Sequence, residues 1–138
     1  MTTRGIRNNN PGNIRESADG GESWVGERIS NDDPDFEEFE KDIYGIRALC
    51  KVLITYQKRY NLMNVNDIIS RWAPPSENDT DHYIHIVSKR LGVDKDDYIN
   101  VQCAGTMELM IRAIIQHENG EQPYSDKTIL TGMELAYA

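Results

Sequence analysis

Long apolar runs are missing from this sequence of 138 residues. The longest apolar stretch, residues 107–115, is interrupted by Glu108 and Arg112. No segment therefore has the length and apolar character of a transmembrane helix, so we expect no insertion into a membrane. No apolar segment follows the first arginines either, which predicts synthesis in the cytoplasm without a signal peptide.

Cysteine is scarce. Cys50 and Cys103 are the two cysteines, and each lies in an apolar, periodic segment, so we expect both to be buried free thiols. The three histidines, His82, His85 and His117, do not have the spacing of a zinc site with a third ligand. The sequence therefore predicts neither a metal nor a cofactor.

Basic residues are also in the minority, with 15 lysines and arginines against 23 acidic residues and a formal net charge of -8. Nucleic acid is therefore excluded as the main partner, because binding to phosphates requires clustered basic side chains. A hydrophobic content of 38% is typical of a globular protein, and the length suits one modest core. We predict a single domain over residues 1–138.

The most distinctive segment is residues 4–15, which holds a run of three asparagines, a Pro-Gly pair and three arginines. Asparagine and glycine tolerate left-handed backbone conformations, so this segment is not expected to be an ordinary helix or core strand. Amide and guanidinium groups suit a ligand rich in hydroxyl, amide and carboxylate groups, such as a glycan with attached peptide. The alternative is a solvated N-terminal arm.

The remaining chain predicts an α+β fold that is mostly α. Residues 14–29 show an imperfect alternation around Asp-Gly-Gly, which favours an antiparallel β-hairpin, and residues 36–39 would add a short third strand. Apolar residues then recur with a helical period, which predicts five to six helices. The clearest are residues 43–60, 65–72, 80–91 after a cap at Asp79 or Thr80, 107–117 after a cap at Thr106, and about 126–136 after a cap at Ser125.

Glu118 is the first candidate for catalysis. It follows the most apolar predicted helix, directly before Asn119 and Gly120. Apolar surroundings and the negative end of a helix both favour the protonated carboxyl group, which is the form that a general acid needs. The alternative is a solvated glutamate at a helix end, and the residues alone leave both interpretations open.

Two further groups can complete such a site. Asp32, Asp33 and Asp35 form either a solvated acidic loop or the second carboxylate that glycoside cleavage requires. Tyr83 lies one turn inside a predicted helix. It is either a core tyrosine or a hydroxyl that steadies positive charge on a sugar ring.

Several long strings resemble a family of small phage proteins associated with tails, virions or lysis. The strings are residues 4–15, 33–39, 44–48, 71–83 and 117–124, which together span nearly the whole chain. The resemblance implies a phage protein and leaves open whether it works in the virion or at lysis.

A more distant resemblance is to the lysozyme-like glucosaminidases of flagella and autolysins. Residues 13–15 are similar to the segment before their hairpin, residues 24–26 to the hairpin, and residues 79–83 to their tyrosine motif, with Tyr83 at the functional tyrosine. In those enzymes the helix that ends in the catalytic glutamate comes first, whereas here the matching helix ends at Glu118. The resemblance therefore implies a circularly permuted lysozyme-like domain.

These observations together predict cleavage of peptidoglycan glycan strands, without a cofactor, by a muramidase, glucosaminidase or lytic transglycosylase. Glu118 would be the acid, Tyr83 would steady the transition state and Asp33 would be the second carboxylate; a distant Asp33 would favour a transglycosylase. Four residues would line the glycan groove: Asn10, Asn13, Arg15 and Trp24.

Such an enzyme would act at the cell wall, as an endolysin or carried in the virion, and would have other virion proteins as possible partners. The competing hypothesis is a non-catalytic virion or wall-binding protein that keeps a lysozyme-like fold.

Overall fold

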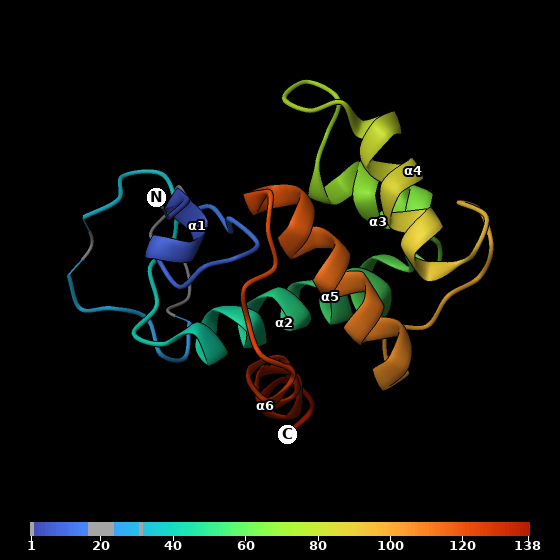
Figure 1. Ribbon diagram of the computed structural model, residues 1–138. Helices are drawn as coiled ribbons and strands as arrows, with labels where there is room; N and C mark the ends of the chain where they lie inside the picture. The colour runs from blue at the N-terminus through green and yellow to red at the C-terminus, as the bar shows by residue number, and fades with distance from the viewer. Residues whose placement is uncertain (1, 17–23, 31) are drawn as a thin grey trace. The chain divides into compact units, whose positions relative to one another are not determined.

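The computed structural model describes residues 2–16, 24–30 and 32–138, and these residues form six helices. The helices are α1 (Arg4–Arg7), α2 (Asp42–Tyr60), α3 (Val65–Trp72), α4 (Thr80–Leu91), α5 (Ala104–Asn119) and α6 (Asp126–Tyr137) (Figure 1). The chain divides into two compact units, Met1–Lys51 with Ile115–Ala138, and Val52–Ile114. No helix in the described part of the chain is long and apolar enough to cross a membrane.

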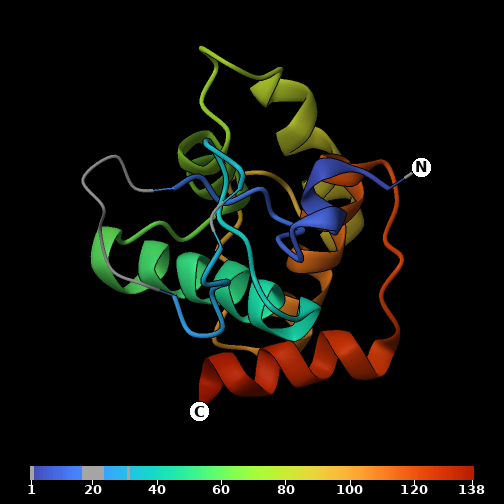
Figure 2. The same cartoon turned by 90° about the vertical axis from the view of Figure 1, so that its left-hand side faces the viewer.

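The first unit joins the two ends of the chain. Its buried apolar residues come from the first half of α2, the end of α5, α6 and residue 39, and they include Phe39, Ile46, Leu49, Ile115, Ile129 and Met133. Helix α6 crosses α2 below it (Figure 2), and Gly132 allows close packing at the crossing, since a Cβ there would lie 2.5 Å from Ile46 Cγ2. Packing between sequence-distant helices therefore forms this core.

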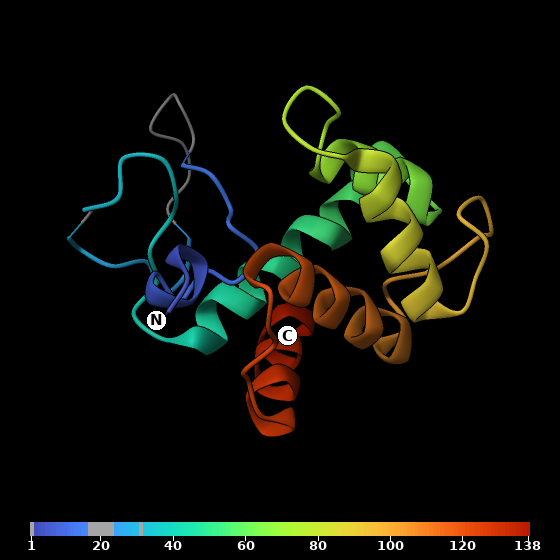
Figure 3. The same ribbon diagram turned by 45° about the horizontal axis from the view of Figure 1, so that its top comes forward.

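The second unit is built from the second half of α2, helices α3 and α4, and most of α5. Helices α3 and α4 are neighbours in it (Figure 3). The segment between α4 and α5 is held by Gln57 of α2, whose Nε2 donates to the carbonyl of Ile99 at 2.9 Å and whose Oε1 accepts from the backbone N–H of Val101 at 2.7 Å. A buried amide thus satisfies backbone groups that no helix can pair.

The predicted N-terminal sheet is wrong. Among the described residues, β-pairing is limited to two isolated bridges, Arg15 with Phe36 and Glu27 with Phe39. The alternation expected around Trp24 is broken by a turn at Gly26, where φ is +78°. The expected tip of the hairpin, within residues 17–23, lies outside the described residues.

Side-chain amides explain why no ladder forms. Asn9 Nδ2 donates to the carbonyl of Phe39 at 3.1 Å, and Asn10 Nδ2 donates to the carbonyls of Ile14 at 2.9 Å and Glu37 at 3.0 Å. These amides occupy the carbonyls of Phe39 and Glu37, which a neighbouring strand would otherwise use. The carbonyl of Ile14 still accepts from the backbone N–H of Glu37 at 2.9 Å. The fold is therefore helical, with irregular segments in place of the predicted sheet.

Two smaller expectations are also corrected. Residues 4–7, in the segment that was expected to be non-helical, form the single turn α1, with Thr3 as its N-cap. Cys50 is a buried free thiol as predicted, but Cys103 is exposed, because it lies just before α5 begins at Ala104.

Candidate functional site

The N-terminal segment packs against the end of α5, as the sequence hypothesis required. Asn13 Nδ2 donates to Glu118 Oε1 at 3.2 Å, which joins residues that are 105 positions apart in the chain. Asn13 reaches this place from a left-handed conformation, with φ of 51°, which asparagine tolerates better than most residues. The contact between the two ends of the chain is confirmed, and the catalytic role of Glu118 stays a prediction.

Asn119, the last residue of α5, anchors the same junction. Its Oδ1 accepts from Thr3 Oγ1 at 2.7 Å, and its Nδ2 donates to the carbonyls of Pro11 at 2.8 Å and Ile115 at 3.0 Å. The side chain is buried, with 7% of its surface exposed. Figure 1 shows the blue N-terminal segment passing beside this end of α5. The junction is therefore fixed by hydrogen bonds inside the protein.

Gly5 makes the close approach possible. A Cβ at this position would lie 2.7 Å from both Asn119 Oδ1 and Asn13 Oδ1, and 2.9 Å from the carbonyl oxygen of Asn10. Contacts this short do not occur at real Cβ atoms, so any side chain here would push the segment away from α5. Gly5 thus allows the N-terminal segment to lie close to Asn119 at the end of α5.

The other residues predicted to bind the glycan take different places. Asn10 is fully buried, and its amide is engaged by the backbone of Ile14 and Glu37. Arg15 is exposed and its guanidinium lies over the Phe36 ring, 5.2 Å from the centroid. Trp24 is half-buried at the start of a turn. Asn10 is therefore a structural residue, while Arg15 and Trp24 keep surface for contact with a ligand.

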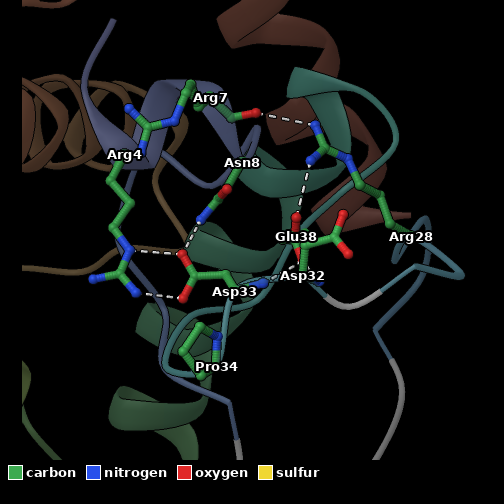
Figure 4. Close-up of a pocket in the computed structure, with 8 residues that line it drawn as sticks. All are labelled: Arg4, Arg7, Asn8, Arg28, Asp32, Asp33, Pro34 and Glu38. Atoms are coloured by element: carbon green, nitrogen blue, oxygen red, sulfur yellow. Dashed lines mark hydrogen bonds and ion pairs between the residues drawn. The ribbon is translucent and has the colours of Figure 1, made fainter.

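Asp33 lies in an ion pair. Arg4 donates to both of its carboxylate oxygens, at 2.6 and 2.5 Å, and Asn8 Nδ2 adds a third bond at 2.9 Å (Figure 4). The backbone N–H groups of Asp35 and Phe36 also donate to it. Arg4 is the main reason why the pKa of Asp33 is held well below its usual range. A carboxylate with so many donors is a weak nucleophile and base.

A polar cavity of about 450 Å³ opens beside this ion pair. It is lined by Arg4, Arg7, Asn8, Arg28, Asp32, Asp33, Pro34 and Glu38 (Figure 4). Arg28 is held on one side by Glu38 Oε1, at 3.2 Å, and by the carbonyl of Arg7, at 3.0 Å. The charges that line the cavity are largely paired with one another, so it is a structural cluster more than a binding site.

Tyr83 belongs to the second unit, where it is 1% exposed. Its hydroxyl oxygen accepts a hydrogen bond from Trp72 Nε1 at 3.2 Å. This environment is that of a core tyrosine, the first of the two interpretations that the sequence left open. A role for its hydroxyl at a sugar ring stays a prediction.

Glu37 is the titratable residue that sequence reasoning missed. Its side chain is 6% exposed, and Oε2 has no hydrogen-bond partner among the described residues. Burial, together with a hydrogen bond to Glu27 and the negative charges of Glu27 and Glu16, raises the pKa of Glu37 to about 8. A carboxyl group in this state is protonated at neutral pH, as a general acid must be.

One signal for Glu37 is present in the sequence, where two acidic residues lie between Phe36 and Phe39. Both acids are buried, yet Glu38 is paired with Arg28 and accepts from the backbone N–H groups of Asp32 and Asp33. Glu37 instead faces Glu27. The two carboxyl groups have different partners because their side chains leave an irregular segment in different directions. No periodicity in the sequence predicts those directions.

Among the described residues, no three histidine, cysteine, aspartate or glutamate side chains come together to hold a metal ion.

The chain is similar to a known bacteriophage protein. No protein-family model matches the sequence. The chain is 43% identical over 134 residues to Protein P5 of Pseudoalteromonas phage PM2, an alignment that covers 97% of this chain and 82% of the phage protein. The chain therefore belongs to the family of this phage Protein P5.

Proposed function

We propose that the protein cleaves the glycan strands of bacterial peptidoglycan, with Glu118 as the general acid. The observation that carries the proposal is the contact between Asn13 and Glu118, at 3.2 Å. A side-chain amide beside the carboxyl group fixes its orientation, and positioning of an acid is a large part of its catalytic effect.

The surroundings of Glu118 support the same role. Ile114 and Ile115, which precede it in α5, are fully buried, and Glu118 itself is half-buried. The carboxyl group is thus attached to a rigid helix and only partly solvated, which suits a catalytic acid. Membership in a phage family agrees with a wall-degrading activity, because a phage must cross the wall of its host.

The route that fits best is that of a lytic transglycosylase. Asp33 is engaged by Arg4 and Asn8, so it does not serve readily as the second carboxylate. In the transglycosylase route, Glu118 gives its proton to the glycosidic oxygen as the bond to C1 breaks. The resulting carboxylate then takes the proton of the sugar's 6-hydroxyl, whose oxygen bonds to C1 and closes a 1,6-anhydro ring.

Turbidity of purified cell walls tests the proposal. We expect wild-type protein to clear the walls and Glu118→Gln to be slower by about 100-fold or more, since glutamine cannot donate the proton. Glu121→Gln is the matched control, because Glu121 is an exposed glutamate three residues further on. Equal rates for wild type and Glu118→Gln would contradict the mechanism.

The second candidate is a non-catalytic virion or wall-binding protein. It is favoured by the structural contacts of Asn10, Asp33 and Tyr83, which leave fewer groups for chemistry. Sedimentation with purified walls separates the two functions. A binding protein would co-sediment without releasing soluble fragments, and Glu118→Gln would not alter its binding.

A further inference from the structure

Glu37 lies in a segment of the first unit that has irregular neighbours on both sides. Its backbone N–H donates to the carbonyl of Ile14 at 2.9 Å, in the N-terminal segment. The carbonyl of the next residue, Glu38, accepts instead from the backbone N–H of Arg28 at 2.9 Å. The segment that carries Glu37 therefore holds the N-terminal segment to the turn that contains Arg28.

The contact between Glu37 and Glu27 needs a proton. Ionised carboxylates have acceptor oxygens only, so a hydrogen bond between these two side chains forms only when one of them is protonated. Glu37 is buried whereas Glu27 is half-buried, so Glu37 keeps the proton. Its Oε2 has no hydrogen-bond partner among the described residues, which costs a neutral carboxyl group much less than it costs a carboxylate. The proton is therefore part of the folded structure.

Loss of this proton would bring negative charges together. The charged groups that act on Glu37 are Glu27, from the turn, and Glu16, from the N-terminal segment, and both are acidic. Arg28, next to Glu27 in the chain, is paired with Glu38 at 3.2 Å. An ionised Glu37 would be a buried charge beside a second carboxylate, so the two side chains would separate and Glu37 would turn towards water.

Asn10 links Glu37 to the residues beside Glu118. Its Nδ2 donates to the carbonyl of Glu37 at 3.0 Å, and its Oδ1 accepts from the backbone N–H of Ile14 at 3.0 Å. The carbonyl of Asn10 also accepts from the backbone N–H of Asn13 at 3.0 Å, and the side chain of Asn13 in turn donates to Glu118. Asn10 is fully buried, so a displacement of Glu37 is transmitted to Asn13 through close-packed groups.

We propose that Glu37 is a positioning residue of the glycan-cleaving site, and that its proton keeps Asn13 in place against Glu118. The inference rests on the function proposed above. While Glu37 is neutral, it bonds to Glu27 and the three segments stay together. When Glu37 ionises, the two carboxyl groups separate and the amide of Asn13 no longer orients Glu118. Cleavage of glycan strands is therefore lost at alkaline pH through Glu37, a residue that does not touch the substrate.

NMR of side-chain carboxyl and amide carbons in the full-length protein tests this coupling without any substrate. The Glu37 carboxyl carbon should titrate with a midpoint near its pKa of about 8, and the Asn13 amide carbon should shift over the same pH range. Glu37→Gln keeps a donor for Glu27 and cannot ionise, so Asn13 should not shift in this variant. A Glu37 midpoint below about 6, or an Asn13 shift that is absent in the wild type or the same in Glu37→Gln, would overturn the proposal.

The pH dependence of wall clearing tests the consequence for the reaction. A group with a pKa of about 8 is about one-tenth protonated at pH 9, so the wild type should clear walls about tenfold more slowly at pH 9 than at pH 7. In Glu37→Gln the rates at the two pH values should lie within about twofold of each other. Glu40→Gln, at an exposed position, is the matched control and should keep the tenfold ratio. The same ratio in Glu37→Gln would refute the role of Glu37.

The two measurements separate this inference from the proposed enzyme activity. A wild type that leaves walls intact at every pH would refute the enzymatic function, whereas the NMR titration decides whether Glu37 controls Asn13. Walls that are cleared with the same pH dependence by the wild type and Glu37→Gln would refute only the role of Glu37. If Glu37→Gln does not fold, the titration of Glu37 and Asn13 in the wild type decides the matter, because it needs no variant.

Discussion

Asparagine side chains in the first unit act mainly as substitutes for backbone hydrogen-bond partners. Asn10 and Asn119 are both buried and bond to carbonyl groups of segments that have no regular neighbour. Asn13 differs because its amide bonds to a carboxylate, that of Glu118. The sequence predicts that these residues are unusual, but it assigns the same role to Asn10 and Asn13, since the direction of an amide depends on what packs against it.

The Asp33 carboxylate has a structural role that pH and mutation can test. Asp33→Ala should lower the free energy of unfolding at neutral pH by about 1–3 kcal/mol, because buried donors lose their acceptor. The ordinary pKa is 3.8 and the folded value is lower, so the contribution of Asp33 is present above that pH and is lost as the pH falls. Urea unfolding at pH 7 and pH 3 measures both effects.

Asp35→Ala is the matched control for this prediction. Asp35 is 56% exposed and has one contact with Arg4, at 3.2 Å, so its loss should change stability by no more than about 0.5 kcal/mol. Equal effects of the two substitutions would show that the buried donors around Asp33 are not important.

The buried Glu37 should give the stability of the folded state the opposite dependence on pH. Its pKa is raised from 4.5 to about 8, so the folded state holds a proton that the unfolded state releases. Stability should therefore fall as the pH rises from about 5 to about 9. Glu37→Gln, which stays neutral, should lose most of this fall, as measured by melting temperature across that range. Glu40→Gln, at an exposed position, should retain this fall in melting temperature. A wild-type melting temperature that does not change across the range would contradict the raised pKa of Glu37.

At the scale of elements, the helices could be predicted because their signals are local. Asp79 and Ser125 are N-caps as expected, and Gly92 ends α4. Helix α5 begins at Ala104, earlier than the predicted cap at Thr106, because the Cys103 side chain accepts from the backbone N–H groups of Gly105 and Thr106 at the start of the helix. Local caps and periodicity thus locate most helix ends to within a few residues.

The predicted hairpin failed for a reason that is not local. Alternation along residues 24–29 satisfies a strand pattern, but a strand also needs a partner with free backbone groups. Here Phe39 donates to the carbonyl of Asn8, and its own carbonyl accepts from Asn9 Nδ2. These contacts join parts of the chain some 30 residues apart, and no short pattern reveals them.

Docking of the N-terminal segment onto α2 depends on Gly45. A Cβ at this position would collide with the carbonyl oxygen of Asn9 and would approach Pro11 Cδ to 3.1 Å. Gly45→Ala should therefore reduce the free energy of unfolding by about 1–3 kcal/mol or more, although alanine favours the helix itself. Denaturant titration measures the change. Gly105→Ala, with open space around it, should be neutral or slightly stabilising, and equal losses in both variants would contradict this account.

For the whole molecule, the main finding is that the two ends of the chain form one unit, in which Asn13 meets Glu118. The resemblance to lysozyme-like glucosaminidases predicted this meeting, as part of a circularly permuted domain, and the apolar helix before Glu118 supported it. Neither the residues nor the resemblance revealed Glu37, because the direction of its side chain depends on how an irregular segment packs. The chain that carries this junction belongs to the family of a phage protein.

Mass analysis of peptidoglycan after treatment tests the central claim most directly. Wild-type protein should release fragments with new glycan ends, in the 1,6-anhydro form if the transglycosylase route is correct. Glu118→Gln should release essentially none, and Glu121→Gln should match the wild type. If the new glycan ends are reducing ends and not anhydro ends, the reaction is hydrolysis and not transglycosylation. Walls left intact by the wild type, or the same new ends from Glu118→Gln, would contradict the claim that Glu118 is the acid of a glycan-cleaving site.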